Sequence, residues 1–400
     1  MEIPKLAING GNPIRETPIY YGKQYIDEDD IKAVDEVLRA PLITCGPKVE
    51  KFERELCKLT GAKYAVALAN GTAALHAACY AANLGEGDEV ITTPITFAAS
   101  ANAAIYVGAI PVFADINAET YNISPIEIRT KITDKTKAII AVDFTGQAAE
   151  LEEIRSICDE FGLVFIEDGA HSIGTKYKGV PVGSIADMTT FSFHPVKTIT
   201  GGEGGAVLTN EKELYKKLLI FRTHGITRDL EQLQNTPDGP WYYEQIDLGY
   251  NYRLTDIQAA LLLSQLNKFE LFSKRRKEIV RIYNEAFRLL PEIIIQKEIE
   301  ESDTTRHLYV INLNLETLNA TRREIFEALW AENICCNVHY IPVYYFPYYE
   351  KKGYKRGICP NAEKFYEAAL TIPLYFSMND QDVKDVIDGI IKVINFYRKG

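Results

Sequence analysis

The chain has no long apolar run, and this lack excludes a membrane-spanning helix. None of its hydrophobic stretches approaches the roughly 18 to 20 residues that cross a bilayer. The N-terminal segment, residues 1–16, has no apolar core behind a basic stretch, so it does not resemble a secretion signal. We therefore predict no transmembrane segment, no membrane partner and a cytoplasmic location.

The chain also lacks any CxxC pair. Its seven cysteines are an odd number, so they cannot all pair within one chain. Widely spaced cysteines of this kind are typical of thiols in a reducing cytoplasm rather than of a disulfide framework or a zinc site. We expect free, buried thiols and no metal site.

Positive charge is in short supply as well. The 44 Lys and Arg residues are outnumbered by 55 Asp and Glu residues, which gives a net charge of −11. Such an acidic chain has no general electrostatic reason to bind nucleic acid. The one basic run, KRRK at 274–277, is interpreted as a solvated helix face. Local basic groups can still hold one phosphorylated ligand.

What the chain does contain is the composition of an ordinary globular protein, with 46% hydrophobic and 25% charged residues. Its 400 residues allow two to three domains. Between residues 64 and 210, short Val- and Ile-rich runs alternate with helical patterns, which predicts a mostly parallel sheet with helices on both faces. The predicted strands are Tyr64–Ala69, Glu89–Thr93, Ile110–Phe113, Ala138–Val142, Val164–Glu167, Met188–Phe193 and Gly205–Thr209.

After residue 210 the pattern changes to α+β. The predicted elements are a helix at Glu211–Arg222, a polar loop at Thr227–Tyr243, a long amphipathic helix from Leu254 to Leu290, a strand at Leu308–Leu313, a helix at Arg322–Glu332 and a strand at Cys336–Tyr340. We place a domain boundary inside the long helix. The predicted organisation is an N-terminal arm (1–25), a large domain (26–270) and a small C-terminal domain (271–400).

A lysine followed by a glycine-rich run is the sharpest chemical feature. Lys197 ends the segment FSFHPVK (191–197), and four glycines follow within TITGGEGG (198–205). Glycine lets the backbone approach a ligand closely, so this run suits a lysine displayed inside a cavity. A surface lysine in a flexible loop explains the segment equally well. Schiff-base chemistry would require surroundings that lower the pKa of the lysine.

A carboxylate at a strand end is the second feature. Asp168 ends an apolar strand, at the edge where open α/β sheets bind ligands. A buried carboxylate there needs a cationic partner, and the protonated pyridine nitrogen of pyridoxal phosphate is one. A simple turn residue at the strand end is the alternative for Asp168. His171 fits either a place over or beside the ring or a structural role.

The third feature is the small-residue segment NGTAAL (70–75), which follows a predicted strand directly. Free N–H groups at a helix N-terminus, with the hydroxyl of Thr72, make a phosphate cradle. Simple N-capping by Asn70 or Thr72 is the alternative. The order of cradle, aromatic Phe97, Asp168 and Lys197 meets the needs of pyridoxal 5′-phosphate: an anchor for the phosphate, a cover for the ring, a charge for its nitrogen and an amine for its aldehyde.

Several segments together resemble the DegT-like nucleotide-sugar aminotransferases, which are fold-type I pyridoxal phosphate enzymes. The segments are NGTAAL (70–75), TPITFAASANA (93–103), IEDGAHSIG (166–174), FSFHPVKTITGGEGGAV (191–207), GYNYRLTDIQAALLLSQL (249–266) and VHYIPVY (338–344). The resemblance runs nearly end to end, and the last three segments are highly specific. It implies a three-layer α/β/α large domain with a mostly parallel sheet, plus a smaller α+β C-terminal domain.

The resemblance also implies roles for the matching residues. Lys197 would form the Schiff base and act as acid and base, while Asp168 would pair with the pyridine nitrogen. Phe97 would cover one ring face. His171 takes the position near the ring hydroxyl where many members carry Gln.

The phosphate site and the assembly follow from the same resemblance. Gly71, Thr72 and Ser192 would hold the phosphate. Asn251 would reach it from a neighbouring subunit, which implies a homodimer with shared active sites. The branch of the family that replaces the lysine with histidine consists of dehydratases, so Lys197 favours transamination.

Within the family, the chain resembles the transaminases of pseudaminic acid biosynthesis. L-Glutamate would then load the cofactor as pyridoxamine phosphate, and the acceptor would be a UDP-linked 2-acetamido-2,6-dideoxy-hexos-4-ulose. The implied sugar contacts are Tyr21, Pro41, Leu42, Ile43, Thr44, Gly71, Ser192, Asn251, His339, Tyr340, Ile341 and Pro342. Other dTDP-, GDP- or UDP-linked keto sugars stay open as acceptors, because the same motifs serve them. A regulator that binds the cofactor without catalysis is a third hypothesis, which the intact Lys197 and Asp168 disfavour.

Overall fold

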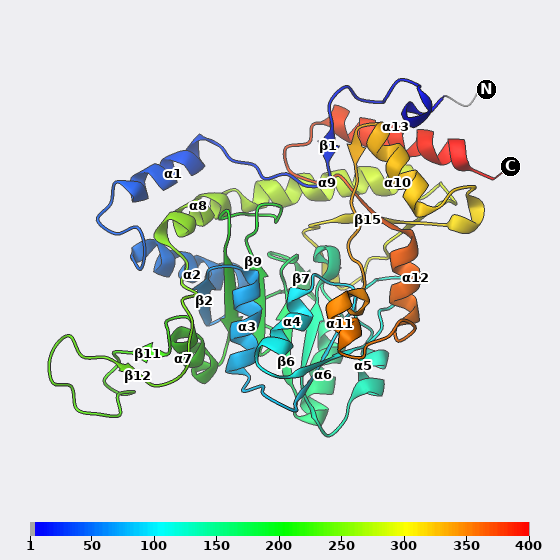
Figure 1. Cartoon of the computed structure of the whole chain (residues 1–400). Helices are drawn as coiled ribbons and strands as arrows, with labels where there is room; N and C mark the ends of the chain where they lie inside the picture. The colour runs from blue at the N-terminus through cyan, green and yellow to red at the C-terminus, as the bar shows by residue number, and fades with distance from the viewer. Residues whose placement is uncertain (1–4, 400) are drawn as a thin grey trace.

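A seven-stranded sheet forms the centre of the computed structural model, which describes residues 5–399 (Figure 1). In sheet order the strands are β2 (Tyr64–Leu68), β10 (Gly205–Thr209), β9 (Met188–Ser192), β6 (Val164–Asp168), β5 (Thr136–Val142), β3 (Glu89–Thr92) and β4 (Ile110–Phe113). Only β10 runs antiparallel to its neighbours, and the other pairs are parallel. The predicted mostly parallel sheet is therefore confirmed.

Helices cover both faces of this sheet because its strands bury alternate side chains in opposite directions. In β6, Ile166 belongs to the core under one group of helices, whereas Phe165 belongs to the core under the other. The first group is α3 (Gly71–Ala81), α4 (Ala99–Tyr106) and α7 (Lys212–Phe221). The second group is α2 (Pro47–Thr60), α5 (Pro125–Lys131), α6 (Leu151–Phe161) and α8 (Asp256–Asn267). This arrangement is the α/β/α layering that the resemblance implied.

The C-terminal part has a core of its own. A three-stranded sheet in the order β13 (Ile293–Ile295), β15 (Tyr309–Leu313) and β17 (Ala369–Ile372) packs with α9 (Phe269–Phe287), α10 (Arg322–Ala331) and α13 (Asp380–Tyr397). The N-terminal arm joins this core through Leu6 and Ile19, and β1 (Ile19–Tyr20) pairs in parallel with β16 (Ile334–Cys335). Residues 1–4 of the predicted arm lie outside the described residues. The domain boundaries themselves stay a prediction.

The single long helix predicted from Leu254 to Leu290 is wrong. The structure has two helices, α8 and α9, separated at Lys268. The Lys268 N–H bonds to the carbonyl of Gln265, only three residues back, so the regular α-helical ladder is interrupted there. The Lys268 amine forms ion pairs with Asp27 (2.5 Å) and Asp30 (2.9 Å), which fix this lysine against the start of α1 (Glu28–Leu38).

The strand predicted at Cys336–Tyr340 is also wrong. After β16 only Asn337 pairs with another strand residue, Thr371, through N–H···O contacts of 2.9 and 2.7 Å. The following residues leave the sheet and line a cavity. The remaining elements are η1 (Ala7–Asn9), η2 (Phe144–Gly146), β7 (Lys176–Tyr177), β8 (Val180–Pro181), β11 (Ile226–Thr227), β12 (Glu244–Gln245), β14 (Ser302–Asp303), η3 (Leu315–Thr317), η4 (Val343–Tyr345), α11 (Pro347–Lys351) and α12 (Pro360–Ala368).

The polar loop predicted at Thr227–Tyr243 connects β11 to β12 and projects from the body of the molecule at the lower left of Figure 1. Within residues 5–399, no helix is both long and apolar enough to cross a membrane. All seven cysteines are free, and five of them are buried. Cys57 is half-buried and Cys45 is exposed, so the expectation of uniformly buried thiols is wrong for these two.

Candidate active site

A cavity of about 890 Å³ opens where β6 and β9 end and α3 begins. Its walls come from the start of α3, the start of α4, the turns after β6 and β9, and the segment after β16. The sequence-predicted residues that line it are Tyr21, Gly71, Thr72, Phe97, Asp168, His171, Ser192, Lys197, His339, Tyr340 and Ile341. Residues far apart in the sequence thus converge on one space.

Other predicted contacts do not line the cavity of this chain. They are Pro41, Leu42, Ile43, Thr44, Asn251 and Pro342. The side chains of Leu42 and Ile43 are exposed just before α2, and Thr44 forms an isolated bridge with Thr255. Asn251 is exposed and forms a similar bridge with Thr223. Ligand contacts by these residues stay predictions.

The N-terminus of α3 has the geometry of an anion site. The Asn70 side chain caps the helix by accepting the Ala73 N–H at 2.8 Å. The N–H groups of Gly71 and Thr72, in the first turn, have no partner within the helix and are available to a ligand. Gly71 also approaches β9 closely, because a Cβ on it would lie 2.8 Å from Ser192 Cβ. Only glycine lets these groups come together.

Asp168 is almost fully buried at the end of β6 and is held by hydrogen bonds. Its Oδ2 accepts from the Ser100 hydroxyl at 2.7 Å, and its Oδ1 accepts from the Ala170 N–H at 3.1 Å. The Thr96 hydroxyl lies 2.7 Å from that of Ser100. Burial raises the pKa of Asp168, while these bonds and the charge of Lys197 oppose the rise. The carboxylate is thus oriented and still able to receive a cation.

Lys197 lies in the turn after β9, where its N–H bonds to the His194 carbonyl at 2.9 Å. Burial lowers the pKa of its amine to about 8, and the charge of Asp168 partly offsets this effect. Among residues 5–399, no ion pair of 4 Å or less joins Lys197 to Asp168, although both line the cavity. The Lys197 amine and the Asp168 carboxylate therefore line one cavity without forming an ion pair with each other.

Four imidazoles border the same cavity, and three of them, those of His171, His307 and His339, are buried. His171 Nε2 lies 3.3 Å from the Tyr340 hydroxyl, and its ring centre is 4.5 Å from that of His307. His339 Nδ1 lies 2.9 Å from the Thr371 hydroxyl. Burial, reinforced by the charge of Lys197, lowers the pKa of all three imidazoles, to about 3 for His339. These rings are neutral near pH 7, so Lys197 faces no competing cation from them.

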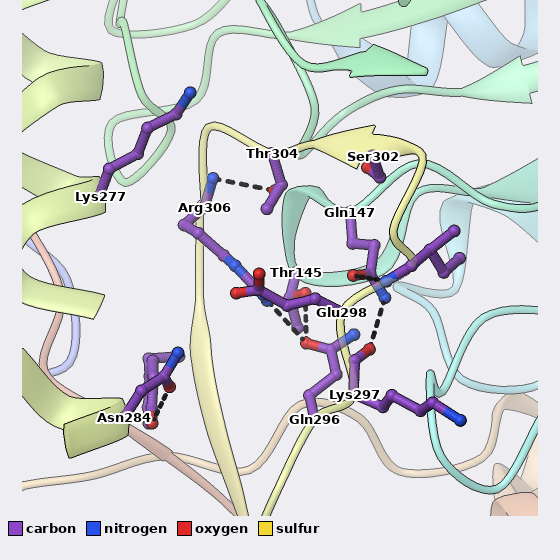
Figure 2. Close-up of polar contacts among 12 residues, drawn as sticks. Thr145, Gln147, Lys277, Asn284, Gln296, Lys297, Glu298, Ser302, Thr304 and Arg306 are labelled. Atoms are coloured by element: carbon purple, nitrogen blue, oxygen red, sulfur yellow. Dashed lines mark hydrogen bonds and ion pairs between the residues drawn. The ribbon is translucent and has the colours of Figure 1, made fainter. Parts of the chain in front are cut away.

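Sequence reasoning missed several residues of the cavity, and Ser100 and His307 are two that bear on its chemistry. Ser100 lies four residues after Thr96 in a segment already recognised, so helical spacing was an available signal. No local signal marks His307, which the link between β14 and β15 carries into the site. Figure 2 shows how the neighbouring Arg306 is anchored, with Gln296 accepting from both Arg306 (3.2 Å) and Thr145 (2.7 Å). The His307 N–H in turn donates to the Thr145 carbonyl at 2.7 Å.

The donor set fits pyridoxal phosphate. The first turn of α3 and Ser192 suit the phosphate, and Asp168 is a buried carboxylate without an ion-pair partner among residues 5–399. A protonated ring nitrogen would supply that missing charge. Lys197 has the lowered pKa that attachment to an aldehyde requires. Phe97 lines the cavity with its side chain 65% exposed and so offers an aromatic face to a ring.

The chain is similar to known proteins over nearly its whole length. It is 40% identical to the spore coat polysaccharide biosynthesis protein SpsC of Bacillus subtilis, over 94% of this chain and 96% of that protein. It is 39% identical to a UDP-4-amino-4,6-dideoxy-N-acetyl-β-L-altrosamine transaminase of Campylobacter jejuni, over 96% of this chain and 99% of that protein. The structure of Helicobacter pylori PseC, an aminotransferase involved in the biosynthesis of pseudoaminic acid, matches with a TM-score of 0.88 and 32% identity, over 95% of this chain and 100% of that one.

Residues 24–391 match a single family description, that of the DegT/DnrJ/EryC1/StrS aminotransferases. The predicted family resemblance and the fold-type I architecture are therefore confirmed, and so is the enzyme class. The chain belongs to the DegT/DnrJ/EryC1/StrS aminotransferase family and is a pyridoxal phosphate-dependent sugar aminotransferase.

Proposed function

We propose that the chain moves the amino group of L-glutamate to the C4 keto group of a UDP-linked 2-acetamido-2,6-dideoxy-hexos-4-ulose. The product would be a UDP-4-amino sugar for a glycan of the pseudaminic acid type. The observation that carries the proposal is the convergence of Lys197, Asp168 and the start of α3 on one cavity. The end-to-end similarity to the Campylobacter transaminase supports this choice of acceptor.

In this proposal separate residues of the chain move the proton, hold the ring nitrogen and bind the phosphate. Pyridoxal phosphate, when bound, supplies an electron sink that lets a C–H bond beside the substrate nitrogen break. Lys197 Nζ takes up and returns the proton, and a pKa of about 8 suits an exchange near neutral pH. Asp168 holds the proton on the ring nitrogen, while Ser100 keeps the carboxylate oriented. The phosphate binds at Gly71, Thr72 and Ser192.

The sugar side of the cavity is assigned to Tyr21, His339, Tyr340 and Ile341. The rings of Tyr21 and His339 pack 5.0 Å apart, and Tyr340 contacts His171. Tyr21, His339 and Tyr340 each carry a polar group beside an aromatic face, and Ile341 is apolar, a combination that suits a deoxy sugar. We further propose a homodimer in which Asn251 reaches the phosphate of the neighbouring subunit, because in its own chain Asn251 does not line the cavity.

A panel of nucleotide-linked keto sugars tests the function. Purified enzyme with pyridoxal phosphate and L-glutamate should form a UDP-4-amino sugar and 2-oxoglutarate, both detected by mass spectrometry. Lys197→Ala should abolish turnover and the absorbance band of the lysine-bound cofactor. Lys63→Ala, an exposed lysine, is the matched control and should keep both. Turnover by Lys197→Ala at the wild-type rate would overturn the proposal.

A second candidate acceptor has specific support. The similarity to SpsC is as high as that to the Campylobacter transaminase, and SpsC serves spore coat polysaccharide biosynthesis. The panel should therefore include dTDP- and GDP-linked 3- and 4-keto sugars and UDP-4-keto-arabinose. A kcat/KM higher for one of these than for the UDP-linked 2-acetamido sugar would replace the proposed acceptor and leave the reaction type unchanged.

A further inference from the structure

Two buried carboxyl groups lie on the far side of the sheet from the cavity, directly behind Asp168. Glu167 precedes Asp168 in β6, so its side chain points to the opposite face. Asp143 follows β5, and its backbone N–H donates to the Asp168 carbonyl at 3.1 Å. The side chains of Asp143 and Glu167 are completely buried. Neither lines the cavity, so the proposed mechanism makes no use of them.

Three of the four carboxyl oxygens of Asp143 and Glu167 accept a hydrogen bond from within the chain. Asp143 accepts from the Ser172 hydroxyl at 2.5 Å and from the Ala149 N–H at 2.9 Å. Glu167 Oε2 accepts from the Thr189 hydroxyl at 2.7 Å. Glu167 Oε1 is buried and has no donor among residues 5–399. This oxygen is the one anomaly in an otherwise satisfied network.

No cation balances the pair. The groups that face it are Ser172, the N–H groups of Ala149 and Gly183, Thr189 and, through the sheet, the carboxylate of Asp168. Within the described part of the chain, no lysine, arginine or histidine forms an ion pair with either carboxyl group.

Two neighbouring carboxylates cannot both stay ionised at such a site. Burial raises the pKa of Asp143, with the charge of Asp168 adding to the rise, and burial and the charge of Asp143 raise that of Glu167. The two side chains lie on the same face of adjacent strands, because Ala141 pairs with Glu167 and Asp143 follows Ala141 by two residues, and side-chain hydrogen bonding between them affects the pKa of both. A proton on Glu167 Oε1 would turn the unpartnered oxygen into a donor to Asp143, which removes the anomaly.

We propose that Glu167 and Asp143 share one proton and act as a positioning pair for Asp168. Glu167 donates to Asp143, and Asp143 holds the Asp168 backbone in place. One negative charge instead of two then lies behind Asp168, so Asp168 is not driven to take up a proton itself. The shared proton does not depend on the proposed function, whereas its benefit to Asp168 rests on the binding of a cofactor with a cationic ring nitrogen.

The shared proton is tested on the protein without cofactor. A carboxyl group whose folded pKa is raised keeps its proton where the unfolded chain has lost it, so stability falls as pH rises above 4.5, the ordinary value for Glu. Glu167→Gln can still donate to Asp143 but does not titrate. Its stability should therefore fall with pH less steeply than that of the wild type, by about one bound proton. Glu86→Gln, in an exposed turn, should keep the wild-type slope.

A second measurement starts from the wild-type protein. The infrared spectrum of the wild-type protein at neutral pH should contain the carbonyl band of a protonated carboxylic acid, and Glu167→Gln should lack it. Equal pH slopes for wild type and Glu167→Gln, or the absence of that band from the wild type, would overturn the shared proton.

The positioning role is tested with pyridoxal phosphate. Glu167→Ala removes the donor to Asp143 and should weaken cofactor binding about 10-fold and shift the pH at which the bound-cofactor absorbance changes. Glu167→Gln should restore the affinity to within about 2-fold of the wild type. An unchanged spectrum and affinity in a destabilised Glu167→Ala would overturn the positioning role. If no keto sugar were aminated, the proposed function would fail while the pH and infrared results stood.

Discussion

The floor and the rim of the cavity differ in how deeply their side chains are buried and in how fully they are hydrogen-bonded. The floor consists of Thr96, Ser100 and Asp168, which are buried, and every one of them has a hydrogen-bond partner within this chain. The rim consists of Phe97 and Ile341, whose side chains are 65% and 39% exposed although they line the same cavity. Covering exposed apolar surface removes it from water and lowers the free energy of the system. The floor is thus complete in one chain, whereas the rim has apolar surface left for a ligand or a second subunit.

This difference implies a division of labour that mutations can break. The floor should serve both halves of the transamination, because cofactor and proton transfer are common to glutamate and keto sugar. Within the rim, Ile341 should serve the acceptor half alone, whereas Phe97, which offers its face to the cofactor ring, should serve both halves. The absorbance of the cofactor gives the rate of each half-reaction separately, so the effect of a substitution on each can be compared.

The largest effect is expected at Asp168. Asp168→Asn keeps the shape of the side chain but removes the charge that faces the ring nitrogen. We expect kcat/KM to fall on the order of 10³-fold in both half-reactions. The circular dichroism spectrum of the variant should match that of the wild type. A loss confined to the keto-sugar half-reaction would contradict the division between floor and rim.

Asp168 in the floor, and Lys197 and the N-terminus of α3 beside it, could be predicted from the sequence because they lie in contiguous segments next to strand ends. Asp168 and Lys197 follow runs of Val, Ile and Phe that only a buried strand explains, and the sheet has the strands expected around them. The N-terminus of α3 likewise follows β2 directly. Local pattern and site geometry agree where one turn separates a strand from its functional residue.

Other features depend on contacts that no local pattern records. His307 enters the site because Arg306 and Thr145 hold its segment from outside. The break at Lys268 depends on Asp27 and Asp30, which are more than 200 residues away in the sequence. No glycine or proline interrupts residues 254–290, so a single helix was the natural expectation. Tertiary contacts overrode the local preference in both places.

The next effect is expected in the phosphate cradle beside the floor. In Gly71→Ala the new Cβ would lie 2.8 Å from Ser192 Cβ, so the first turn of α3 must move away from β9. The loss of one charge-assisted hydrogen bond to the phosphate should raise the Kd for pyridoxal phosphate about 10- to 100-fold. Titration of the cofactor by fluorescence measures this change. Gly85→Ala, where a Cβ meets open space, is the control and should bind normally.

Mixing two inactive variants tests whether the rim is completed by a second subunit. A dimer of Lys197→Ala with Asn251→Ala would contain one site with an intact lysine and an intact partner Asn251. Random pairing makes half of the dimers mixed, and each mixed dimer has one such site of two, so about a quarter of the wild-type activity should return. Refolding the two variants together, with each variant refolded alone as a control, gives the measurement. No recovery in dimers shown to be mixed would argue against shared sites.

The smallest effect is expected at Ile341, and it separates rim from floor most cleanly. Ile341→Ser removes apolar contact with the acceptor but touches neither Lys197 nor the phosphate cradle. The KM for the keto sugar should rise about 10-fold, while the rate of the glutamate half-reaction should stay at the wild-type value. Ile126→Ser, an exposed isoleucine in α5, controls for the loss of an apolar surface group and should change neither. An equal loss in both half-reactions would show that Ile341 also acts on the cofactor or on glutamate, and it would contradict the assignment of Ile341 to the acceptor alone.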